Sequence, residues 1–328
     1  MSLETESSQS YPLPKPQTQA ETARLDIQHA LSLADANGAL LLSPFPPPNG
    51  TSLHVADIGS GTGSWTLNFA HRYPSTNVVG IDLSLPAIET PANATFVIHD
   101  LQKPWPATGA LARQFDLIHG RQILLNLPDP VTALRHAFDR LRPGGIIEFR
   151  EWWCPMGWEG DQDSVPLLVE WHRWTVEAAA RIGCDHGFAE KLPGALESVG
   201  FVALHVVDSR VELGGWGSGD ERNEKTDLLL RELIRVGAPA YAGKMFVGLL
   251  GWDVKRAEDY AERVARELER HDLQRDKIFS RFRVVWAKKP DSTWGNAWKD
   301  AIMSAFVPTM GLAAQGAAGF LAQTTFCL

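Results

Sequence analysis

A short apolar segment that runs into an acidic residue and three closely spaced glycines constrains the fold of this chain more than any other feature. It reads V-A-D-I-G-S-G-T-G and spans residues 55–63. Glycine lets the backbone turn sharply and lets a ligand approach with no side chain in the way. The next segment, residues 65–73, carries apolar residues at helical spacing. We therefore predict a strand, a tight turn and a helix whose first amides face a small ligand.

The spacing of the glycines distinguishes between cofactors. A dinucleotide site normally carries G-x-G-x-x-G, whereas this chain has G-x-G-x-G at Gly59, Gly61 and Gly63. The preceding Asp57 would repel a pyrophosphate but would attract the ammonium of an amino-acid cofactor. Asp82 ends the next apolar run, 19 residues after Gly63 (82 − 63), where a carboxylate can accept hydrogen bonds from both ribose hydroxyls. These charges favour S-adenosylmethionine over NAD.

Further strand ends extend the pattern. A third predicted strand, residues 95–100, ends at Asp100, which we assign to the adenine amino group, and the following Leu101 is expected to cover the adenine ring. A fourth strand, residues 115–119, precedes Arg121, and a fifth, residues 146–150, follows an R-P-G-G turn. Strands alternating with helices from residue 53 to residue 150 predict a parallel sheet that helices cover on both faces, with the ligand-bearing turns at one edge.

Taken together, these motifs resemble a known family. The order D-x-G-x-G-T-G, I-D-L-S, H-D-L, F-D-L-I-H and L-R-P-G-G is similar to that of class I S-adenosylmethionine-dependent methyltransferases. R-L-D-I-Q-H, H-G-R and F-R-V-V-W-A-K-K-P resemble the LaeA-like fungal methyltransferases of secondary metabolism, over roughly residues 11–290. The resemblance implies a Rossmann-like, seven-stranded, mostly parallel sheet and places Leu83 at the cofactor. Arg121 is expected to pair with the cofactor carboxylate, with a loop salt bridge as the alternative.

Histidine is the natural candidate for the chemistry. Methyl transfer is a displacement at a sulfonium carbon, so the protein mainly holds donor and acceptor in line in a dry pocket. A hydroxyl or acidic nitrogen also gains from a general base near neutral pH. His119, at the end of the fourth strand, is our candidate base, with a structural histidine as the alternative. His29 lies in a predicted N-terminal helix that closes over the cofactor as a lid, where it contacts substrate or only packs.

Tryptophans cluster after the predicted fifth strand. Aromatic faces there predict a pocket for a flat, hydrophobic acceptor and can attract a sulfonium, while core packing is the alternative for each of them. Glu151 beside them is a second candidate acid or base, or a solvated edge residue. The candidate substrate-binding tryptophans are Trp152, Trp153, Trp158, Trp171 and Trp174.

Composition and periodicity divide the chain into parts. Residues 1–21 read as a flexible arm, and residues 22–290 as the methyltransferase domain, with a cofactor half at 50–151 and a cap or substrate region at 152–278. Helical spacing occurs at 165–182, 190–199, 224–236 and 256–271, and strands are predicted at 201–208 and 279–288. The last two strands thus close the sheet and enclose a helical cap. Residues 291–328 form a C-terminal extension.

Charge and cysteine content exclude several classes of function. A formal net charge of −8 argues against a nucleic-acid or membrane partner. The three cysteines are scattered without a C-x-x-C, which indicates neither a metal site nor a disulfide framework. A reducing, cytoplasmic setting follows, with the nucleus as an alternative. We expect a hydrophobic small molecule as substrate, and a homodimer through the cap or the C-terminal extension stays open.

The leading hypothesis is methyl transfer to oxygen or nitrogen of a hydrophobic small molecule in fungal secondary metabolism. One alternative is a regulator of that metabolism that keeps the fold without turnover. Another is an enzyme that uses a bound sulfonium as an electrostatic catalyst for a cyclisation or rearrangement.

Overall fold

The computed structural model describes residues 19–45, 52–161, 163, 165–216, 219–270 and 272–291. The chain separates into two units, Met1–Pro290 and Asp291–Leu328, and every described helix and strand lies in the first. The predicted arm up to residue 18 and the C-terminal extension after Asp291 lie outside the described residues. The helices are α1 (Gln19–Asp35), α2 (Ser64–Arg72), α3 (Pro130–Arg140), α4 (Leu167–Ala180), α5 (Phe188–Val199), α6 (Glu221–Tyr241) and α7 (Val254–Glu267). The strands are β1 (His54–Ile58), β2 (Asn77–Asp82), β3 (Ala94–Ile98), β4 (Phe115–Arg121), β5 (Leu141–Trp158), β6 (Val202–Glu212) and β7 (Ile278–Lys288).

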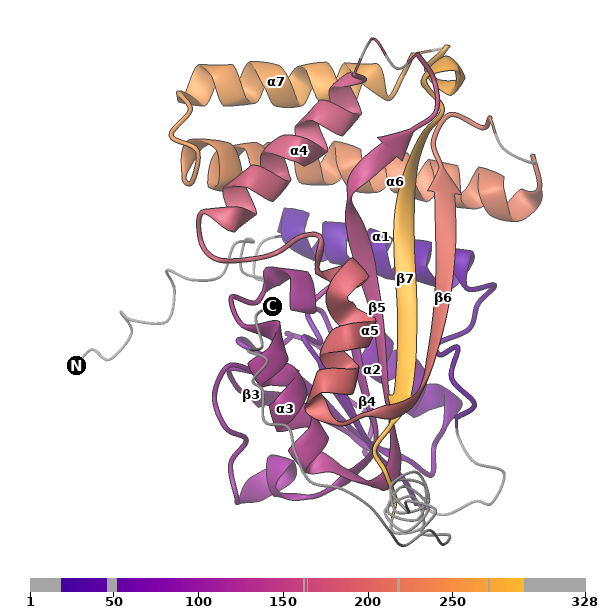
Figure 1. Cartoon of the computed structure of the whole chain (residues 1–328), viewed down its shortest axis with the longest axis vertical. Coiled ribbons are helices and arrows are strands. Elements are labelled where there is room, and N and C mark those ends of the chain that lie inside the picture. The colour runs from indigo at the N-terminus through magenta and orange to yellow at the C-terminus, as the bar shows by residue number, and fades with distance from the viewer. Residues whose placement is uncertain are drawn as a thin grey trace, which may run out of the picture. The chain divides into compact units, whose positions relative to one another are not determined.

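In the described part of the chain the strands form one seven-stranded sheet, in the order β3-β2-β1-β4-β5-β7-β6. Strands β1 to β5 run parallel, and β7 is antiparallel to both of its neighbours. The predicted α/β fold and its antiparallel closing strand are therefore confirmed (Figure 1). The register sets Asp57 of β1 between Gly80 of β2 and His119 of β4, so the carboxyl ends of these strands meet at one edge.

Alternation along the strands gives the sheet two apolar faces. On one face Val55 packs with Phe69 of α2. On the other face Ile58 packs with Leu134 of α3 and Leu192 of α5. All five side chains are at most 1% exposed, and burying each one contributes roughly 1.5–3 kcal/mol. This pattern explains why the parallel half could be recognised from short apolar runs.

Strand β5 is much longer than predicted. It was expected to end at Arg150, but it continues to Trp158 and pairs with β7 over this extension. Trp152 and Trp153 are therefore strand residues rather than members of a following loop. The sequence concealed this because Pro155 normally ends a strand; a register shift after Trp153 accommodates it. Strand β6 likewise continues beyond its predicted end at residue 208. Strand β5 runs without a break across residue 151, where we placed the boundary between the cofactor half and the cap region.

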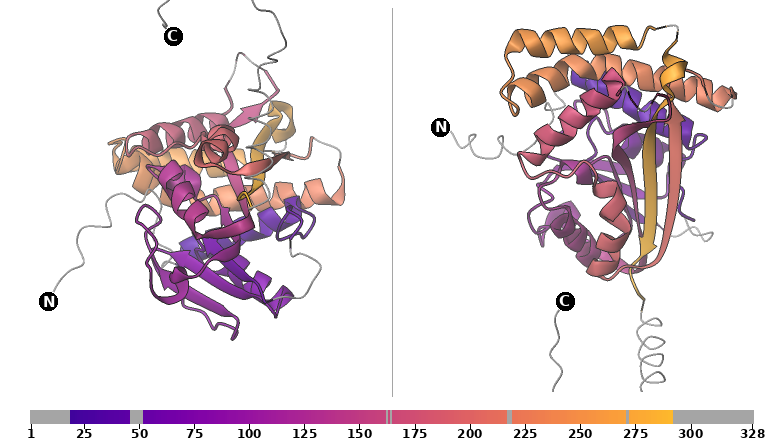
Figure 2. Two further views of the ribbon diagram at one scale, coloured as in Figure 1. Left: turned by 60° about the horizontal axis from the view of Figure 1, so that its bottom comes forward. Right: turned by 45° about the horizontal axis from the view of Figure 1, so that its top comes forward.

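The predicted helical cap lies at the carboxyl end of β5 and the amino end of β7. Helices α4, α6 and α7 gather at this end of the sheet (Figures 1 and 2). Together with a π-helical turn (Ala242–Val247) they enclose a second apolar core. At its centre the ring of Phe246 lies 4.5 Å from that of Trp171 and 4.9 Å from that of Trp252. Met156 of β5 and Phe282 of β7 belong to the same cluster, so the strands themselves join the cap to the sheet.

Helix α1 is the predicted lid, and it begins earlier than expected. Gln19–Glu21, which we assigned to the arm, already form its first turn. The helix packs along α6. Its last residue, Asp35, accepts hydrogen bonds from Arg150, Ser209 and Arg222, so three separate elements fix the carboxyl end of the lid.

Candidate active site

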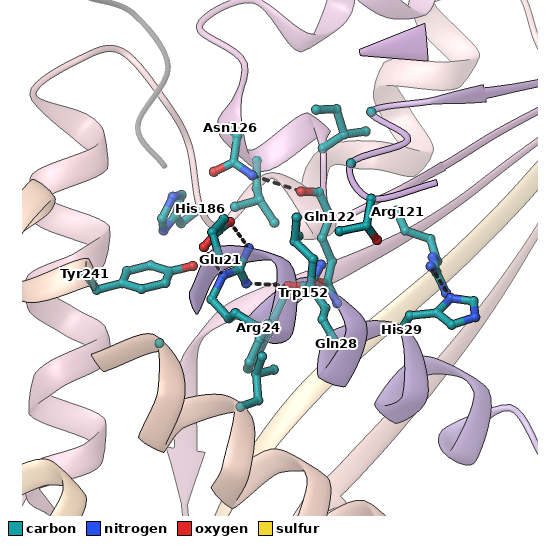
Figure 3. A pocket seen from close by; sticks show the side chains of 18 of the residues that line it. Glu21, Arg24, Gln28, His29, Arg121, Gln122, Asn126, Trp152, His186 and Tyr241 are labelled. Carbon is teal, nitrogen blue, oxygen red and sulfur yellow. Dashed lines mark hydrogen bonds and ion pairs between the residues drawn. The ribbon is translucent and has the colours of Figure 1, made fainter. Parts of the chain in front are cut away.

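A cavity opens at the carboxyl edge of the parallel strands, between the sheet, the lid and the cap (Figure 3). Its lining contains part of the turn between β1 and α2 (residues 59–63, the glycine loop), the segment after β4, the middle of β5, and faces of α1, α4 and α6. It brings together eight of the predicted site residues: His29, Asp57, Gly59, Gly61, Asp82, Arg121, Trp152 and Trp171.

The glycine loop and Asp82 form one hydrogen-bonded unit. The Gly61 amide donates to Asp82 Oδ2 at 2.8 Å, and the Leu83 amide donates to Asp82 Oδ1 at 2.7 Å. Burial raises the pKa of the Asp82 carboxyl, although these bonds oppose the shift. Gly61 has a φ of +56°, and a Cβ there would lie 3.5 Å from Leu25 of the lid. The loop thus presents bare backbone to the cavity beneath α1.

Asp57 is held rigidly behind this loop. Its Oδ2 accepts from Thr66 Oγ1 at 2.7 Å, and its Oδ1 lies 2.9 Å from His119 Nδ1. The His119 ring stacks on Trp65 at 3.7 Å and is 1% exposed. Burial lowers the pKa of His119, against the influence of Asp57. His119 does not line the cavity, so its position suits orienting Asp57 rather than deprotonating a substrate.

Arg121 and His29 close one end of the cavity. Arg121 donates from Nη2 to His29 Nδ1 at 2.7 Å (Figure 3). His29 Nε2 lies 2.7 Å from Asn68 Nδ2. Burial lowers the pKa of His29 to about 3 and that of Arg121 to about 10. A neutral imidazole therefore positions the guanidinium. In the described part of the chain no carboxylate forms a salt bridge with Arg121, which leaves it able to bind an anionic ligand.

The lid contributes a polar wall. Glu21 accepts from Arg24 at both oxygens, at 2.8 and 2.7 Å, and Arg24 also donates to Gln28 at 2.7 Å. The Arg24 guanidinium lies 6.0 Å from the Tyr241 ring of α6. Asp26, on the same helix, accepts from Ser64 at 2.9 Å, which ties the lid to the start of α2. The contacts to Tyr241 and Ser64 connect α1 to α6 and α2.

The opposite end of the cavity combines aromatic and polar groups. Trp152 of β5 and Trp171 of α4 line it, together with His172 and His186. Burial lowers the pKa of His172 to about 3, helped by the neighbouring His186, and that of His186 to about 4. Both imidazoles are therefore neutral near pH 7. This end is less purely apolar than the sequence suggested.

Three predicted substrate-binding tryptophans lie elsewhere. Adjacent strand residues point to opposite faces, so Trp153 is turned away from the cavity, where Arg281 and Arg283 lie 4.2 and 4.4 Å from its ring. Trp158 packs against the cap core, and Trp174 meets Trp252 at 5.3 Å. We therefore do not retain these three as substrate residues.

Four predicted cofactor residues also lie outside the cavity lining: Gly63, Leu83, Asp100 and Leu101. A Cβ on Gly63 would lie 2.6 Å from the Phe96 ring, so this glycine allows α2 and β3 to pack. Asp100 accepts from the Gln102 amide at 2.9 Å, and Leu101 is buried. Both follow β3, next to Asp82, and their contact with adenine stays a prediction.

Several lining residues escaped the sequence reasoning. Gln122 and Asn126 follow β4, where the rule that ligands bind at strand ends could have found them. His172, His186 and Tyr241 come from distant elements and carry no local signal. Their role depends on the tertiary arrangement alone.

Two buried groups, Glu151 beside the cavity and Cys154 in its lining, are poorly suited to the chemistry. Glu151 is fully buried, and its Oε1 accepts from the Ile123 and Leu124 amides, both at 3.2 Å. It is thus not a solvated edge residue. Burial raises the pKa of the Cys154 thiol to about 12, which leaves it unreactive. Among the described residues no group of three or more His, Cys, Asp or Glu is placed to hold a metal ion, and no helix combines the length and apolarity that a membrane span needs.

Comparison with known proteins agrees with this arrangement. The model of a family described as "Methyltransferase domain" matches residues 29–206, more than half of the chain. Methyltransferase pytC of Aspergillus terreus is 29% identical over 86% of this chain and 84% of its own length. The probable methyltransferase tdiE of Emericella nidulans is 30% identical over 76% of each chain. Secondary metabolism regulator LAE1 of Cochliobolus heterostrophus is 27% identical over 63% of this chain and 66% of its own length.

Proposed function

This chain belongs to the methyltransferase-domain family, and from that premise we propose that it transfers a methyl group from S-adenosylmethionine to oxygen or nitrogen of a hydrophobic small molecule in fungal secondary metabolism. One observation carries the proposal. A single cavity joins the glycine loop and Asp82 at one side to Trp152 and Trp171 at the other, which gives a donor and an acceptor adjacent places.

The residues at the donor side fit the cofactor. Bare backbone at Gly61 leaves space that a side chain would fill, and Asp82 keeps a lone pair for the ribose hydroxyls beyond the backbone amides that it binds. Arg121, a half-buried cation without a carboxylate partner among the described residues, suits the carboxylate of the methionine moiety. When bound, the cofactor supplies an electrophilic methyl group.

The chain's own residues then act mainly by position. Leu25 of the lid helix and Tyr241 of the cap both line the cavity, and we expect the two elements to shield a bound donor and acceptor from water. Asp57 cannot turn, since Thr66 and His119 hold both of its oxygens. Fixing donor and acceptor in line can account for most of the rate of a displacement.

Calorimetry followed by a transfer assay tests this function. We expect S-adenosylhomocysteine to bind and NAD not to bind. Incubation with labelled S-adenosylmethionine and a host metabolite extract should then give labelled small molecules. If NAD binds while S-adenosylhomocysteine gives no heat, the cofactor assignment is wrong.

A regulator without small-molecule turnover is the second candidate, and the likeness to LAE1 favours it. The two candidates differ in the assay above. A regulator would bind S-adenosylhomocysteine and label no small molecule. The extension of the cavity to Trp152 and Trp171 favours the enzyme, because cofactor binding alone does not require an aromatic space beside the cofactor residues.

A further inference from the structure

The acceptor end of the cavity holds polar atoms that no other described residue satisfies. The side chains of Trp152, His172 and His186 each bury a nitrogen without a hydrogen-bond partner there: Nε1, Nδ1 and Nε2, respectively. Gln122 Nε2 and Asn126 Oδ1 are also buried without a hydrogen-bond partner among the described residues. All five residues line the same cavity. Leaving a buried polar group unpaired costs about 1–3 kcal/mol. The cluster is therefore complementary to a polar group on a ligand.

Two of these atoms have complementary hydrogen-bonding character, one as a donor and the other as an acceptor. The Trp152 and His172 rings lie 5.7 Å apart at an angle of 46°. The indole Nε1 can only donate, whereas a neutral imidazole has one nitrogen that accepts. His172 stays neutral because burial and the adjacent His186 lower its pKa to about 3. A hydroxyl group satisfies both partners at once, since its oxygen accepts and its hydrogen donates.

The charges around this end disfavour an ammonium group. Glu21, the carboxylate of the lid wall, is paired with Arg24 at both oxygens. His172 and His186 are neutral, and the Cys154 thiol stays protonated. An aliphatic amine would have to bury a positive charge without a counterion, which is costly.

On these grounds we propose that the acceptor is a flat molecule with a hydroxyl group, which accepts from Trp152 Nε1 and donates to His172 Nδ1. This inference rests on the proposed function and narrows its substrate class. Trp152 and His172 are then specificity-determining residues. The flanking polar atoms of His186, Gln122 and Asn126 suit a second oxygen on the same molecule.

Three naphthalene probes test the inference. Calorimetry on the protein saturated with S-adenosylhomocysteine compares 2-naphthol, 2-methoxynaphthalene and 1-naphthylmethylamine. We expect 2-naphthol to bind roughly 3- to 10-fold more tightly than the methyl ether, the scale of one or two lost hydrogen bonds, and the amine to bind more weakly still.

Two variants test whether His172 and Trp152 cause the preference for 2-naphthol. His172→Leu and Trp152→Phe should each remove the preference for 2-naphthol and leave affinity for S-adenosylhomocysteine unchanged, which also shows that they fold. His172→Gln should restore part of the preference. His205→Leu, on exposed β6 with its ring stacked on Trp286 at 4.9 Å, is the matched control.

The outcomes separate this inference from the proposed function. A protein that does not bind S-adenosylhomocysteine contradicts the proposed function. If that binding is intact, three results overturn the inference: no detectable binding of 2-naphthol, equal affinity for 2-naphthol and its methyl ether, or an unchanged preference in both His172→Leu and Trp152→Phe.

Discussion

Glu151 tests how the burial of one carboxyl group makes the stability of the protein depend on pH. Its carboxyl is fully buried in β5, where Oε1 accepts from the Ile123 and Leu124 amides and Oε2 has no partner among the described residues. Burial raises its pKa from 4.5 to about 8, although the backbone hydrogen bonds oppose this shift. The folded protein therefore keeps Glu151 protonated at neutral pH, whereas the unfolded chain ionises it.

The size of the effect follows from the shift. Because the folded pKa is the higher one, the folded state holds the proton more tightly, and its stabilising contribution is lost as pH rises through the range from 4.5 to about 8. One pKa unit corresponds to about 1.4 kcal/mol. The difference of about 3.5 units (8 − 4.5) therefore corresponds to roughly 5 kcal/mol, most of it lost between pH 5 and pH 9.

Glu151→Gln isolates this contribution because glutamine keeps the shape of the protonated acid and does not titrate. Urea unfolding at pH 5, 7 and 9 should show similar stability for variant and wild type at pH 5. The variant should be the more stable protein at pH 9, by roughly 3–4 kcal/mol. Glu190→Gln, at an exposed position on α5, is the matched control and should show no such trend. Parallel pH curves for wild type and Glu151→Gln would refute the reasoning.

Three further variants test the site and its lid. Asp82→Ala should weaken S-adenosylhomocysteine binding by roughly 1.5–3 kcal/mol in calorimetry, whereas the exposed Asp139→Ala should not; equal affinities would remove Asp82 from the site. Gly61→Val should abolish this binding while the circular dichroism spectrum stays native. The reason is that a branched side chain resists a φ of +56° and fills the space beside the ligand. Retained binding would mean that the loop lies away from the cofactor. Asp35→Ala should lower the free energy of unfolding by roughly 3–5 kcal/mol, since it leaves Arg150 buried without its carboxylate partner. A loss below about 1 kcal/mol would show that other contacts hold the lid in place.

Local sequence determined the cofactor side of this protein. The segment from Val55 to Gly63, and Asp82 after the next strand, are close in the chain and follow rules of turn geometry and burial that operate over a few residues. Parallel strands with right-handed crossovers then place their carboxyl ends together. The parallel sheet and the placing of the glycine turn and Asp82 at one edge of it could therefore be predicted from short segments of sequence. The order of the strands was not predicted, because it depends on pairing between distant segments.

The acceptor side depended on the tertiary structure. The extension of β5 to Trp158 is stabilised by backbone hydrogen bonds to β7, which lies more than 100 residues further along the chain. Because side chains alternate along that strand, Trp152 faces the cavity while Trp153 faces away. Richness in tryptophan could not reveal this difference.

The roles of the histidines also depend on the tertiary structure. His119 and His172 are the same residue type, yet one is enclosed between Asp57 and Trp65 while the other lines the cavity with a free nitrogen. A sequence motif gives the position of a side chain along an element. Burial and neighbours, which set its charge and its access to a ligand, arise only when distant elements pack together.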